Sequence, residues 1–459
     1  LSGLVGSEMC IRDSFIAAID LGTSHMVGMV GTKNATGALS IIAYEVENSG
    51  TCIRRGCVYN VKETASKIRR LILKLENKLG GAKIGQVYVG LGGQSLRSIE
   101  HTVCKVLGTE GVVTEEIIDS LYQECKDYRP DMLTVLDVVS PSYFLDDKPE
   151  SNPVGVPCSR IEARYKLIVG RPSLKLNIIN SISEQAKIEI AGILVSPLAL
   201  GDVVLSDNEK DLGCALIGFG AGVTTITVYK GGKLASLSVV PFGGNLITKD
   251  ITNLRVVESE AERLKITYGS AKADRDNDMT IQVSLADGMG LREIKLAELN
   301  GVIEARMDEI LENVYARLEA TGLMSVLGAG IVITGGGAAL KNLPAVMSER
   351  LKMEVRYSAV RKGIVASGDL VVASNPEYAV AVGLLAKGTK NCALYIPPKP
   401  EPKIEPVVEP EPTVEPTPEP VKEKPKKEKK KGPGLFGRLT KGIDTFGKTL
   451  FDDDDNESK

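Results

Sequence analysis

Three glycine-rich segments have the residue types and spacing to bind phosphate groups. They are "DLGTS" at 20–24, "FGAGVTT" at 219–225 and "TGGGA" at 334–338. Glycine after a strand lets backbone amides approach an anion closely, because no Cβ stands in the way. A tight hairpin or a helix cap explains any single segment equally well, since 47 of 459 residues are glycine. Three such segments after strand-like runs favour a phosphate site.

Other kinds of site are disfavoured. No segment matches the P-loop GxxxxGK[ST], and no turn gives a dinucleotide-binding GxGxxG with a suitably placed acidic residue. Only two histidines are present, which argues against a zinc site or a histidine-based triad. A net charge of -3 and an aromatic content of 4% argue against a nucleic-acid partner. Eight scattered cysteines without CxxC pairs are typical of a reducing, cytosolic environment.

The elements that position the glycines occur twice. Residues 15–31 predict a strand, a tight turn and a second strand, and residues 213–234 predict the same order followed by a third strand. This repeat predicts a duplicated α/β fold with a cleft between two halves. Helical patterns begin at Asn60 and at about residue 297. Residues 98–176 contain six prolines and several strand-like runs, which predict an inserted α+β subdomain.

Both ends of the chain differ from the middle. Residues 1–14 lack the basic start and long apolar run of a secretory signal. They resemble a translated sequencing-adapter remnant, and a short disordered extension is the alternative. Residues 397–433 are rich in proline, glutamate and lysine, which predicts a disordered linker. Residues 452–459 form an acidic end.

The segment 434–451 predicts an amphipathic helix. At about 100° per residue, one face collects large apolar side chains and the far side collects cationic ones. The apolar set is Leu435, Phe436, Leu439, Ile443, Phe446 and Leu450, with Phe451 on its flank, and the cationic set is Arg438, Lys441 and Lys448. This pattern is typical of a helix that lies in an anionic membrane interface. Docking on the protein's own body or on a partner is the alternative, which the long linker disfavours.

Several segments, in this order, resemble the actin-like ATPase superfamily and, within it, the FtsA family of bacterial cell-division proteins. They are "AAIDLGTS", "LIGFGAGVTT", "VVPFGGNLITKDI", "SEAERLKITYG", "VITGGGAAL" and "NPEYAVAVGLLA". The likeness covers residues 15–390, and the segments "VGLGGQS" and 142–170 resemble FtsA more than the superfamily at large. It implies an α/β, actin-like duplicated ribonuclease-H-like fold: two lobes around a nucleotide cleft, an inserted α+β subdomain and a disordered C-terminal tail.

The resemblance also implies a division of the chain. Lobe 1 would comprise residues 15–97, 177–205 and 371–396, around the inserted subdomain 98–176, called 1C. Lobe 2 would comprise residues 206–250 and 326–370, around a small subdomain 251–325, called 2B.

The resemblance implies a site for ATP and Mg²⁺. The first phosphate turn would contain Asp20, Gly22, Thr23 and Ser24, with Asp20 near the metal through water. The second would contain Gly220, Gly222 and Thr224. Gly243 and Gly244 would lie beside the nucleotide, Glu262 and Lys265 near the ribose and adenine, and Gly335, Gly336 and Gly337 against the adenosine. A solvated ion pair is the alternative for Glu262 and Lys265.

Two residues depart from the family pattern. Gly218 stands where the second turn usually begins with Asp, and His25 stands where relatives commonly have Lys. Losing a carboxylate and a cation from a site that works by positioning and electrostatics predicts nucleotide binding with weak or no hydrolysis. A polar residue without a special role is the alternative for His25.

The resemblance implies an ATP-binding protein that self-assembles into filaments and tethers the FtsZ ring to the inner membrane during septum formation. Its implied partners are the FtsZ C-terminal peptide, further copies of itself, other division proteins and an anionic membrane surface. It would act at the cytoplasmic face of that membrane, at the septum. The alternatives are a small-molecule kinase of the superfamily, a pilus-type actin-like adaptor and a chaperone-type ATPase.

Overall fold

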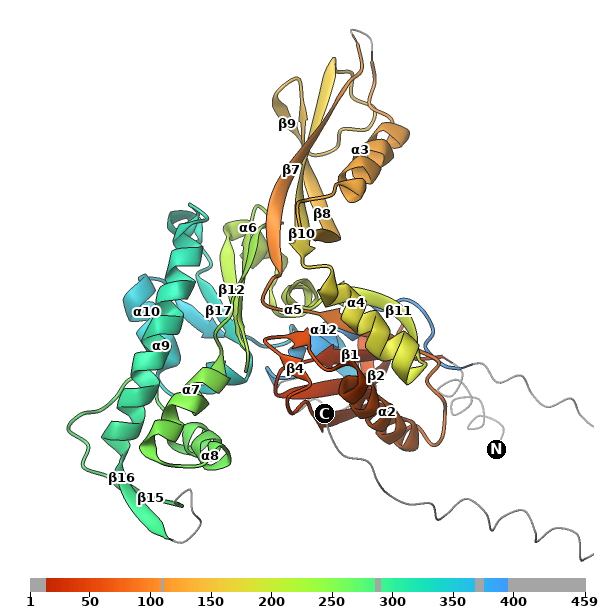
Figure 1. The fold of residues 1–459 in the computed structure, drawn as a ribbon. Coiled ribbons are helices and arrows are strands. Elements are labelled where there is room, and N and C mark those ends of the chain that lie inside the picture. The colour runs from red at the N-terminus through yellow and green to blue at the C-terminus, as the bar shows by residue number, and fades with distance from the viewer. Residues whose placement is uncertain (1–13, 109–110, 285–289, 368–374, 395–459) are drawn as a thin grey trace, which may run out of the picture. The chain divides into compact units, whose positions relative to one another are not determined.

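The computed structural model describes residues 14–108, 111–284, 290–367 and 375–394 (Figure 1). The chain divides into two units, Leu1–Pro397 and Pro398–Lys459, and every described residue belongs to the first. The predicted linker, the amphipathic segment 434–451, the acidic end and residues 1–13 lie outside the described residues.

The first lobe is built on a six-stranded sheet of order β11-β6-β1-β2-β3-β19. Its strands are β1 (Ile16–Leu21), β2 (His25–Lys33), β3 (Leu39–Asn48), β6 (Gln86–Leu91), β11 (Glu189–Val195) and β19 (Val365–Ser367). β1 pairs antiparallel with β2 through a tight turn. It pairs parallel with β6, which the chain reaches through the crossover helix α2 (Val61–Lys78). The Asn60 side chain caps α2 by accepting from the Glu63 N–H, so the predicted helix start is confirmed.

The second lobe repeats this arrangement. Its sheet has the order β14-β13-β12-β17-β18. The strands are β12 (Cys214–Phe219), β13 (Thr224–Lys230), β14 (Lys233–Val240), β17 (Ile331–Thr334) and β18 (Val355–Tyr357). Like β3-β2-β1-β6-β11 in the first sheet, the series has two antiparallel pairings followed by two parallel ones. The predicted duplicated α/β fold is confirmed.

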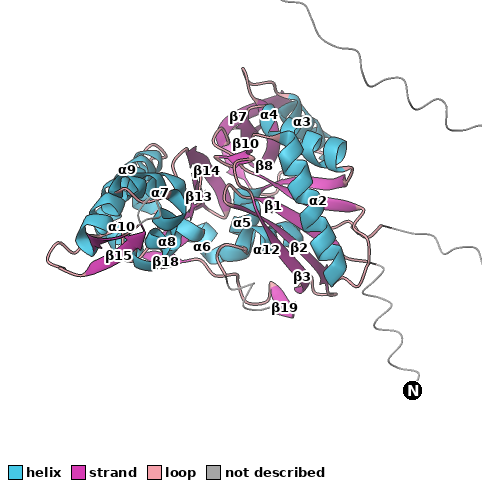
Figure 2. Ribbon diagram, turned by 60° about the horizontal axis from the view of Figure 1, so that its bottom comes forward, coloured by secondary structure: helices cyan, strands magenta, loops and turns pink. Residues whose placement is uncertain are grey.

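Helices cover the two sheets (Figure 2). In the first lobe they are α2, α4 (Ser173–Ile179), which continues as a π-helix over Asn180–Ala186, α5 (Ser196–Val204) and α12 (Ala379–Lys387). In the second lobe they are α6 (Asp207–Leu212), α7 (Gly244–Ile251), α8 (Glu258–Tyr268), α9 (Leu296–Glu319) and α10 (Leu343–Leu351). Short 3-10 turns lie at Thr252–Leu254, Met324–Val326 and Gly336–Ala339. Two small hairpins complete the lobes: β4 (Ile53–Arg54) with β5 (Cys57–Val58), and β15 (Thr280–Ser284) with β16 (Leu291–Lys295).

Helix-to-sheet packing forms two large cores. One fills the first lobe and extends to one face of the second sheet, where it includes Cys214, Leu216 and Val332, and the other fills the rest of the second lobe. In the first lobe, α2 packs so tightly on β2 that a Cβ at Gly28 would lie 2.8 Å from Leu75 Cδ1. In the second, α9 buries the side chains of Ile303, Ile310 and Val314. In the described ranges no helix is both long and apolar enough to cross a bilayer.

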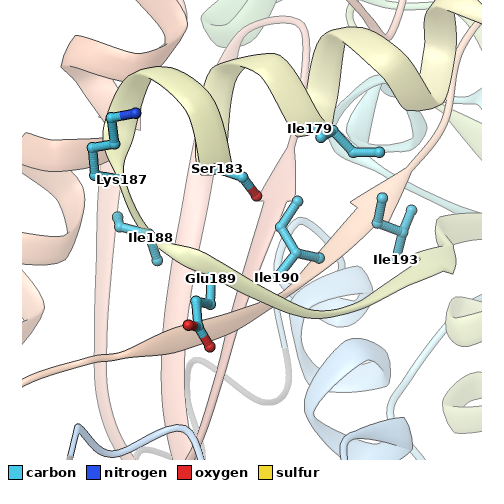
Figure 3. Close-up of a pocket in the computed structure, with 7 residues that line it drawn as sticks. All are labelled: Ile179, Ser183, Lys187, Ile188, Glu189, Ile190 and Ile193. Carbon is cyan, nitrogen blue, oxygen red and sulfur yellow. The ribbon is translucent and has the colours of Figure 1, made fainter.

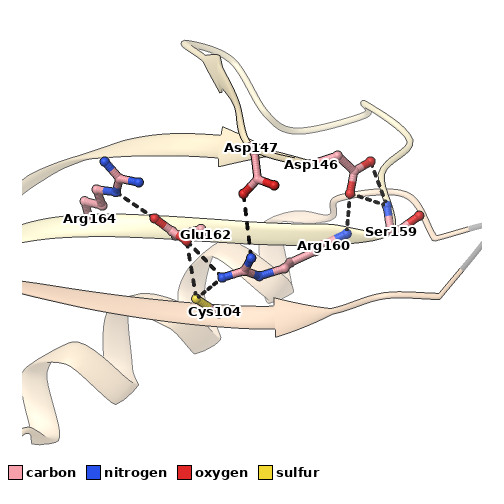
Figure 4. Close-up of polar contacts among 7 residues, drawn as sticks. All are labelled: Cys104, Asp146, Asp147, Ser159, Arg160, Glu162 and Arg164. Atoms are coloured by element: carbon pink, nitrogen blue, oxygen red, sulfur yellow. Dashed lines mark hydrogen bonds and ion pairs between the residues drawn. The ribbon is translucent and has the colours of Figure 1, made fainter.

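A third core belongs to the inserted α+β subdomain, which is therefore confirmed. Its sheet has the order β7-β10-β8-β9, and α3 (Glu115–Asp127) packs against it. The strands are β7 (Arg97–Val106), β8 (Thr134–Leu145), β9 (Lys148–Glu150) and β10 (Arg160–Gly170). Polar contacts line one end of this sheet (Figure 4): Arg160 Nη2 lies 3.0 Å from Glu162 Oε2, and Arg164 Nε lies 2.6 Å from Glu162 Oε1.

The inserted subdomain also contacts the second lobe. Lys233 Nζ donates to the Pro141 carbonyl oxygen at 2.6 Å. Further along β14, the Leu237 N–H donates to Ser98 Oγ at 2.8 Å. The edge strand β14 of the second sheet is therefore linked to two strands of the inserted sheet, β8 and β7.

Candidate nucleotide site

The first glycine turn joins β1 to β2. A Cβ at Gly22 would lie 2.4 Å from the His25 carbonyl oxygen, so only glycine fits this position without a shift of the backbone. Ser49 Oγ donates to the Gly22 carbonyl oxygen at 2.7 Å. Thr23 Oγ1 accepts from the Gly56 N–H at 2.9 Å. Two segments from later in the first lobe therefore hold the turn in place.

Asp20 is the second-last residue of β1, shortly before this turn. Its side chain is half-buried, and burial raises the pKa of the carboxyl from 3.8 to about 6, against a smaller lowering by the backbone of Leu21. Asp20 Oδ1 lies 3.2 Å from the position that a Cβ on Gly90 would take. A nearby cation stabilises the ionised form of such a buried carboxyl group, because its charge compensates for the lost solvation.

The second turn joins β12 to β13 and packs against the start of α7. The Gly244 N–H donates to the Gly220 carbonyl oxygen at 3.0 Å, and the Asn245 N–H donates to the Ala221 carbonyl oxygen at 2.8 Å. A Cβ at Gly243 would lie 2.5 Å from the Gly220 oxygen. Turn and helix start can approach this closely only because Gly243 has no side chain.

The two turns touch each other. The position of a Cβ on Gly222 lies 2.6 Å from Thr23 Oγ1 and 2.9 Å from the Arg55 Cα. The third segment lies against the start of the second turn, because a Cβ at Gly335, whose φ is +85°, would lie 2.6 Å from the Phe219 carbonyl oxygen. The three glycine segments, which are far apart in the sequence, are therefore neighbours.

The third segment also approaches the chain that precedes α12. A Cβ at Gly336 would lie 2.9 Å from Glu377 Oε1, and one at Gly337 would lie 2.9 Å from Phe219 Cβ. The backbone at Gly336 and Gly337 is thus packed against side chains from both lobes.

Glu262 and Lys265 lie together on α8 and connect it to α7. Lys265 Nζ donates to Glu262 Oε2 at 2.7 Å, to Thr248 Oγ1 at 2.8 Å and to the Gly244 carbonyl oxygen at 3.2 Å. The pair is therefore more than a contact between neighbouring turns of one helix. It ties α8 to the start of α7, beside Gly243 and Gly244. Thr224, from the same side, is buried and donates to the Phe242 carbonyl oxygen at 2.9 Å.

One of the two departures from the family pattern lies on β12 and the other at the start of β2. Gly218 pairs with Thr225 across β12 and β13. A Cβ at Gly218 would lie 2.6 Å from Thr225 Oγ1, so the hydroxyl occupies space that a larger residue would need. His25, the first residue of β2, follows the first turn, and its Nδ1 lies 2.9 Å from Oγ of Ser24, the last residue of that turn.

The residues fit Mg²⁺ that is bound mainly through a nucleotide. Mg²⁺ uses one or two carboxylates and otherwise keeps waters and phosphate oxygens. Asp20 supplies one carboxylate beside the first turn, and burial has already raised its pKa. Within the described part of the chain no cluster of three or more His, Cys, Asp or Glu side chains could hold a metal without a nucleotide.

Two surface hollows lie away from these residues. One groove of about 610 Å³ runs along the edge strand β11 and the π-helix (Figure 3). It is lined by Ile179, Ser183, Lys187, Ile188, Glu189, Ile190 and Ile193. Another, of about 450 Å³, lies between residues 324–330 and 351–354. None of the predicted site residues lines either hollow.

Sequence reasoning did not find Ser49, Arg55, Gly56, Gln94 or Glu377, which contact the glycine segments or their neighbours. One local signal was available. Arg55–Gly56 is a dipeptide of the kind that two-residue hairpins favour, with glycine at the second central position. The contact of these five residues with the glycine segments depends on tertiary packing, which leaves no periodic pattern in the sequence.

Two duplicated sheets whose glycine turns meet define an actin-like protein. A solved structure, of the PilM-PilN type IV pilus biogenesis complex, has this fold. That structure is similar to this chain with a TM-score of 0.57 and 16% sequence identity, and the match covers 81% of this chain and 97% of that chain. At this identity the likeness is one of fold.

Sequence comparison then gives the family. The model of the family "Cell division protein FtsA" matches residues 215–383. The FtsA of Porphyromonas gingivalis is 38% identical over 390 residues, which cover 84% of this chain and 81% of that protein. The FtsA of Bacillus subtilis is 32% identical over 390 residues, which cover 83% and 85%. The chain belongs to the FtsA family, and its role is that of an actin-like protein of cell division.

Proposed function

We propose that this protein binds ATP with Mg²⁺ between its lobes, self-assembles on the inner membrane and tethers the FtsZ ring to that membrane during septum formation. The observation that carries the proposal is the 38% identity to a cell division protein FtsA over 84% of the chain. The site of action is the cytoplasmic face of the membrane at the division septum. The other partners are further copies of the chain and other division proteins.

The contact between the glycine segments supports ATP binding. The first and second turns come from opposite halves of the duplicated fold and lie together where Thr23 Oγ1 is 2.6 Å from the position of a Cβ on Gly222. Backbone N–H groups at such turns can bind phosphate, because glycine leaves room for the anion to approach them. Asp20 would hold Mg²⁺ through water, and the cluster around Lys265 would lie on the side of the ribose and adenine. When bound, Mg²⁺ would neutralise part of the negative charge of the phosphates.

Weak hydrolysis follows from Gly218. A carboxylate at position 218 would help to orient Mg²⁺ and the attacking water, and glycine lacks it. A larger residue would also need space there, because Thr225 Oγ1 lies close to the position of a Cβ on Gly218. We therefore propose a nucleotide-dependent assembly protein rather than a fast ATPase. Filament formation would respond to closure of the two lobes around ATP.

The membrane contact is assigned to the segment 434–451, on the sequence pattern alone. Burial of about seven large apolar side chains, at roughly 1.5 kcal/mol each, contributes on the order of 10 kcal/mol at most. Ordering the helix consumes much of this free energy. One anchor therefore binds reversibly, and a filament that carries many anchors is held by avidity. The FtsZ peptide is assigned to the small subdomain of lobe 2, residues 251–325.

Flotation with anionic liposomes tests the tether. The full chain is expected to float and to carry FtsZ with it, whereas a chain that lacks residues 432–459 stays in the dense fraction. Ile443→Glu puts a charge on the apolar face and should also abolish flotation, while Asp453→Asn, in the acidic end, should not. Equal flotation of the full and shortened chains would remove the membrane part of the proposal. Flotation without FtsZ would remove the tether.

A further inference from the structure

The tip of the β4–β5 hairpin has an uncommon backbone conformation. The hairpin pairs Arg54 with Cys57, so Arg55 and Gly56 form its two-residue turn. Their φ angles are 50° and 72°. Positive φ at both central positions gives the turn preferred in such hairpins, which suits glycine and is uncommon for a residue with a Cβ. Non-glycine residues held in this way gather at binding sites.

This tip lies against both phosphate turns. The Gly56 N–H donates to Thr23 Oγ1 at 2.9 Å. The Arg55 Cα lies 2.9 Å from the position of a Cβ on Gly222, and Thr23 Oγ1 lies 2.6 Å from the same position. The backbone of Arg55 and the two turns therefore meet at one point. In Figure 1, β4 lies on the side of the first lobe that faces the second lobe.

The guanidinium of Arg55 has a neutral partner. Arg55 Nη1 donates to Gln94 Oε1 at 3.2 Å, and the Gln94 N–H donates to the Arg55 carbonyl oxygen at 3.1 Å. Gln94 follows β6, which runs parallel to β1, so both strands end at the same edge of the sheet. Among the described residues no carboxylate forms an ion pair with Arg55. The side chain is long and exposed, so its positive charge can pair with a bound anion.

Two other cations of the proposed site and the hairpin, Lys265 and Arg54, have partners of their own. Lys265 is held by Glu262, Thr248 and the start of α7. The Arg54 guanidinium lies 3.8 Å above the ring of Tyr59. The residue that follows the first turn is His25 rather than a lysine. The terminal phosphate carries more negative charge than either of the other two phosphates of a triphosphate, and hydrogen bonds between ionised groups are the stronger ones.

We propose that Arg55 is a phosphate-binding residue, whose guanidinium exchanges Gln94 for the terminal phosphate of a nucleoside triphosphate held between the turns. Arginine suits this role because its planar fork binds phosphate with two parallel hydrogen bonds. The inference rests on the proposed binding of ATP. It adds a ligand from the hairpin tip, which discriminates the triphosphate from the diphosphate.

Calorimetric titration of the full chain with AMPPNP and with ADP, each with Mg²⁺, tests this role. Arg55→Gly removes the guanidinium and suits the positive φ, so it keeps the turn. Arg55→Ala removes the same group in case glycine loosens the hairpin. Arg54→Ala is the matched control, since it deletes the neighbouring exposed charge. Thermal unfolding without nucleotide checks that each variant folds.

Both Arg55 variants are expected to weaken AMPPNP binding by roughly ten- to a hundredfold, which is the range of one charge-assisted hydrogen bond. ADP binding should change by less than about threefold, and Arg54→Ala should leave both affinities unchanged. Equal losses for AMPPNP and ADP, or no loss, would overturn the role of Arg55 while leaving ATP binding intact. An unmutated chain that binds neither nucleotide would overturn the proposed function as well.

Discussion

Asp20 shows how one residue of the proposed nucleotide site can weaken the fold. Its carboxyl has a pKa of about 6 because burial disfavours the charged form. As the pH rises from 4 to 6, the unfolded chain releases this proton first, so the free energy of unfolding falls. The decline ends above the folded-state pKa, and at neutral pH the ionised side chain costs on the order of 2–3 kcal/mol. A bound Mg²⁺ offsets this cost.

Asp20→Asn should therefore stabilise the nucleotide-free protein at pH 7.5, by up to about 2–3 kcal/mol, since an amide needs no charge at this position. At pH 4 the variant and the unmodified chain should have similar stabilities, because the carboxyl is then protonated in the folded chain and only about half ionised in the unfolded one, so little of the cost has developed. Thermal unfolding of both proteins between pH 4 and 8 measures the difference. Parallel pH profiles would show that Asp20 is not the group responsible.

At the scale of elements, turns decide which strands pair. Asp146 and Asp147 join β8 to β9 with φ angles of 45° and 66°, which is again the preferred hairpin turn. The Asp146 carboxylate also accepts from the Ser159 N–H at 3.2 Å and from the Arg160 N–H at 2.9 Å (Figure 4). One side chain thus fixes the hairpin and the start of β10.

Asp146→Ala should destabilise the inserted subdomain by about 1–3 kcal/mol, because it places a Cβ without a polar group at positive φ and leaves two N–H groups unpaired. Asp146→Asn keeps the side-chain oxygen and tolerates this φ, so it serves as the matched variant and should cost much less. Amide hydrogen exchange at Ser159 and Arg160 provides the local measurement. Equal exchange in the two variants would contradict the assigned hydrogen bonds.

The elements that sequence could predict are those with a local signature. The alternating strands, the glycine turns and the cap at Asn60 all depend on neighbours within a few residues. The π-helix at Asn180–Ala186 was not predicted, because its apolar pattern resembles that of an α-helix. The membership of the hairpin tip in the site was not predicted either. Arg55 and Gly222 are brought together by packing between the two lobes.

At the scale of the whole described fold, duplication places the glycine turns opposite each other. The pairing of β1 with β2 and β6 is repeated by β12 with β13 and β17. Each copy therefore ends its first strand in a turn at the same relative position. Sequence predicted this arrangement from the repeated period. The contacts of Lys233 and Leu237 with the inserted subdomain were missed, because long-range hydrogen bonds of this kind have no sequence pattern.

The central claim is that the two halves of the fold grip one nucleotide. Amide hydrogen exchange of the full chain, with and without saturating Mg²⁺ and AMPPNP, tests it most directly. Exchange should slow together, by about tenfold or more, in peptides covering Gly22–Ser24, Gly220–Gly222 and Gly335–Gly337, because bound nucleotide suppresses local opening. Slowed exchange in only one half of the fold, or none in any of the three peptides at saturation, would contradict the account.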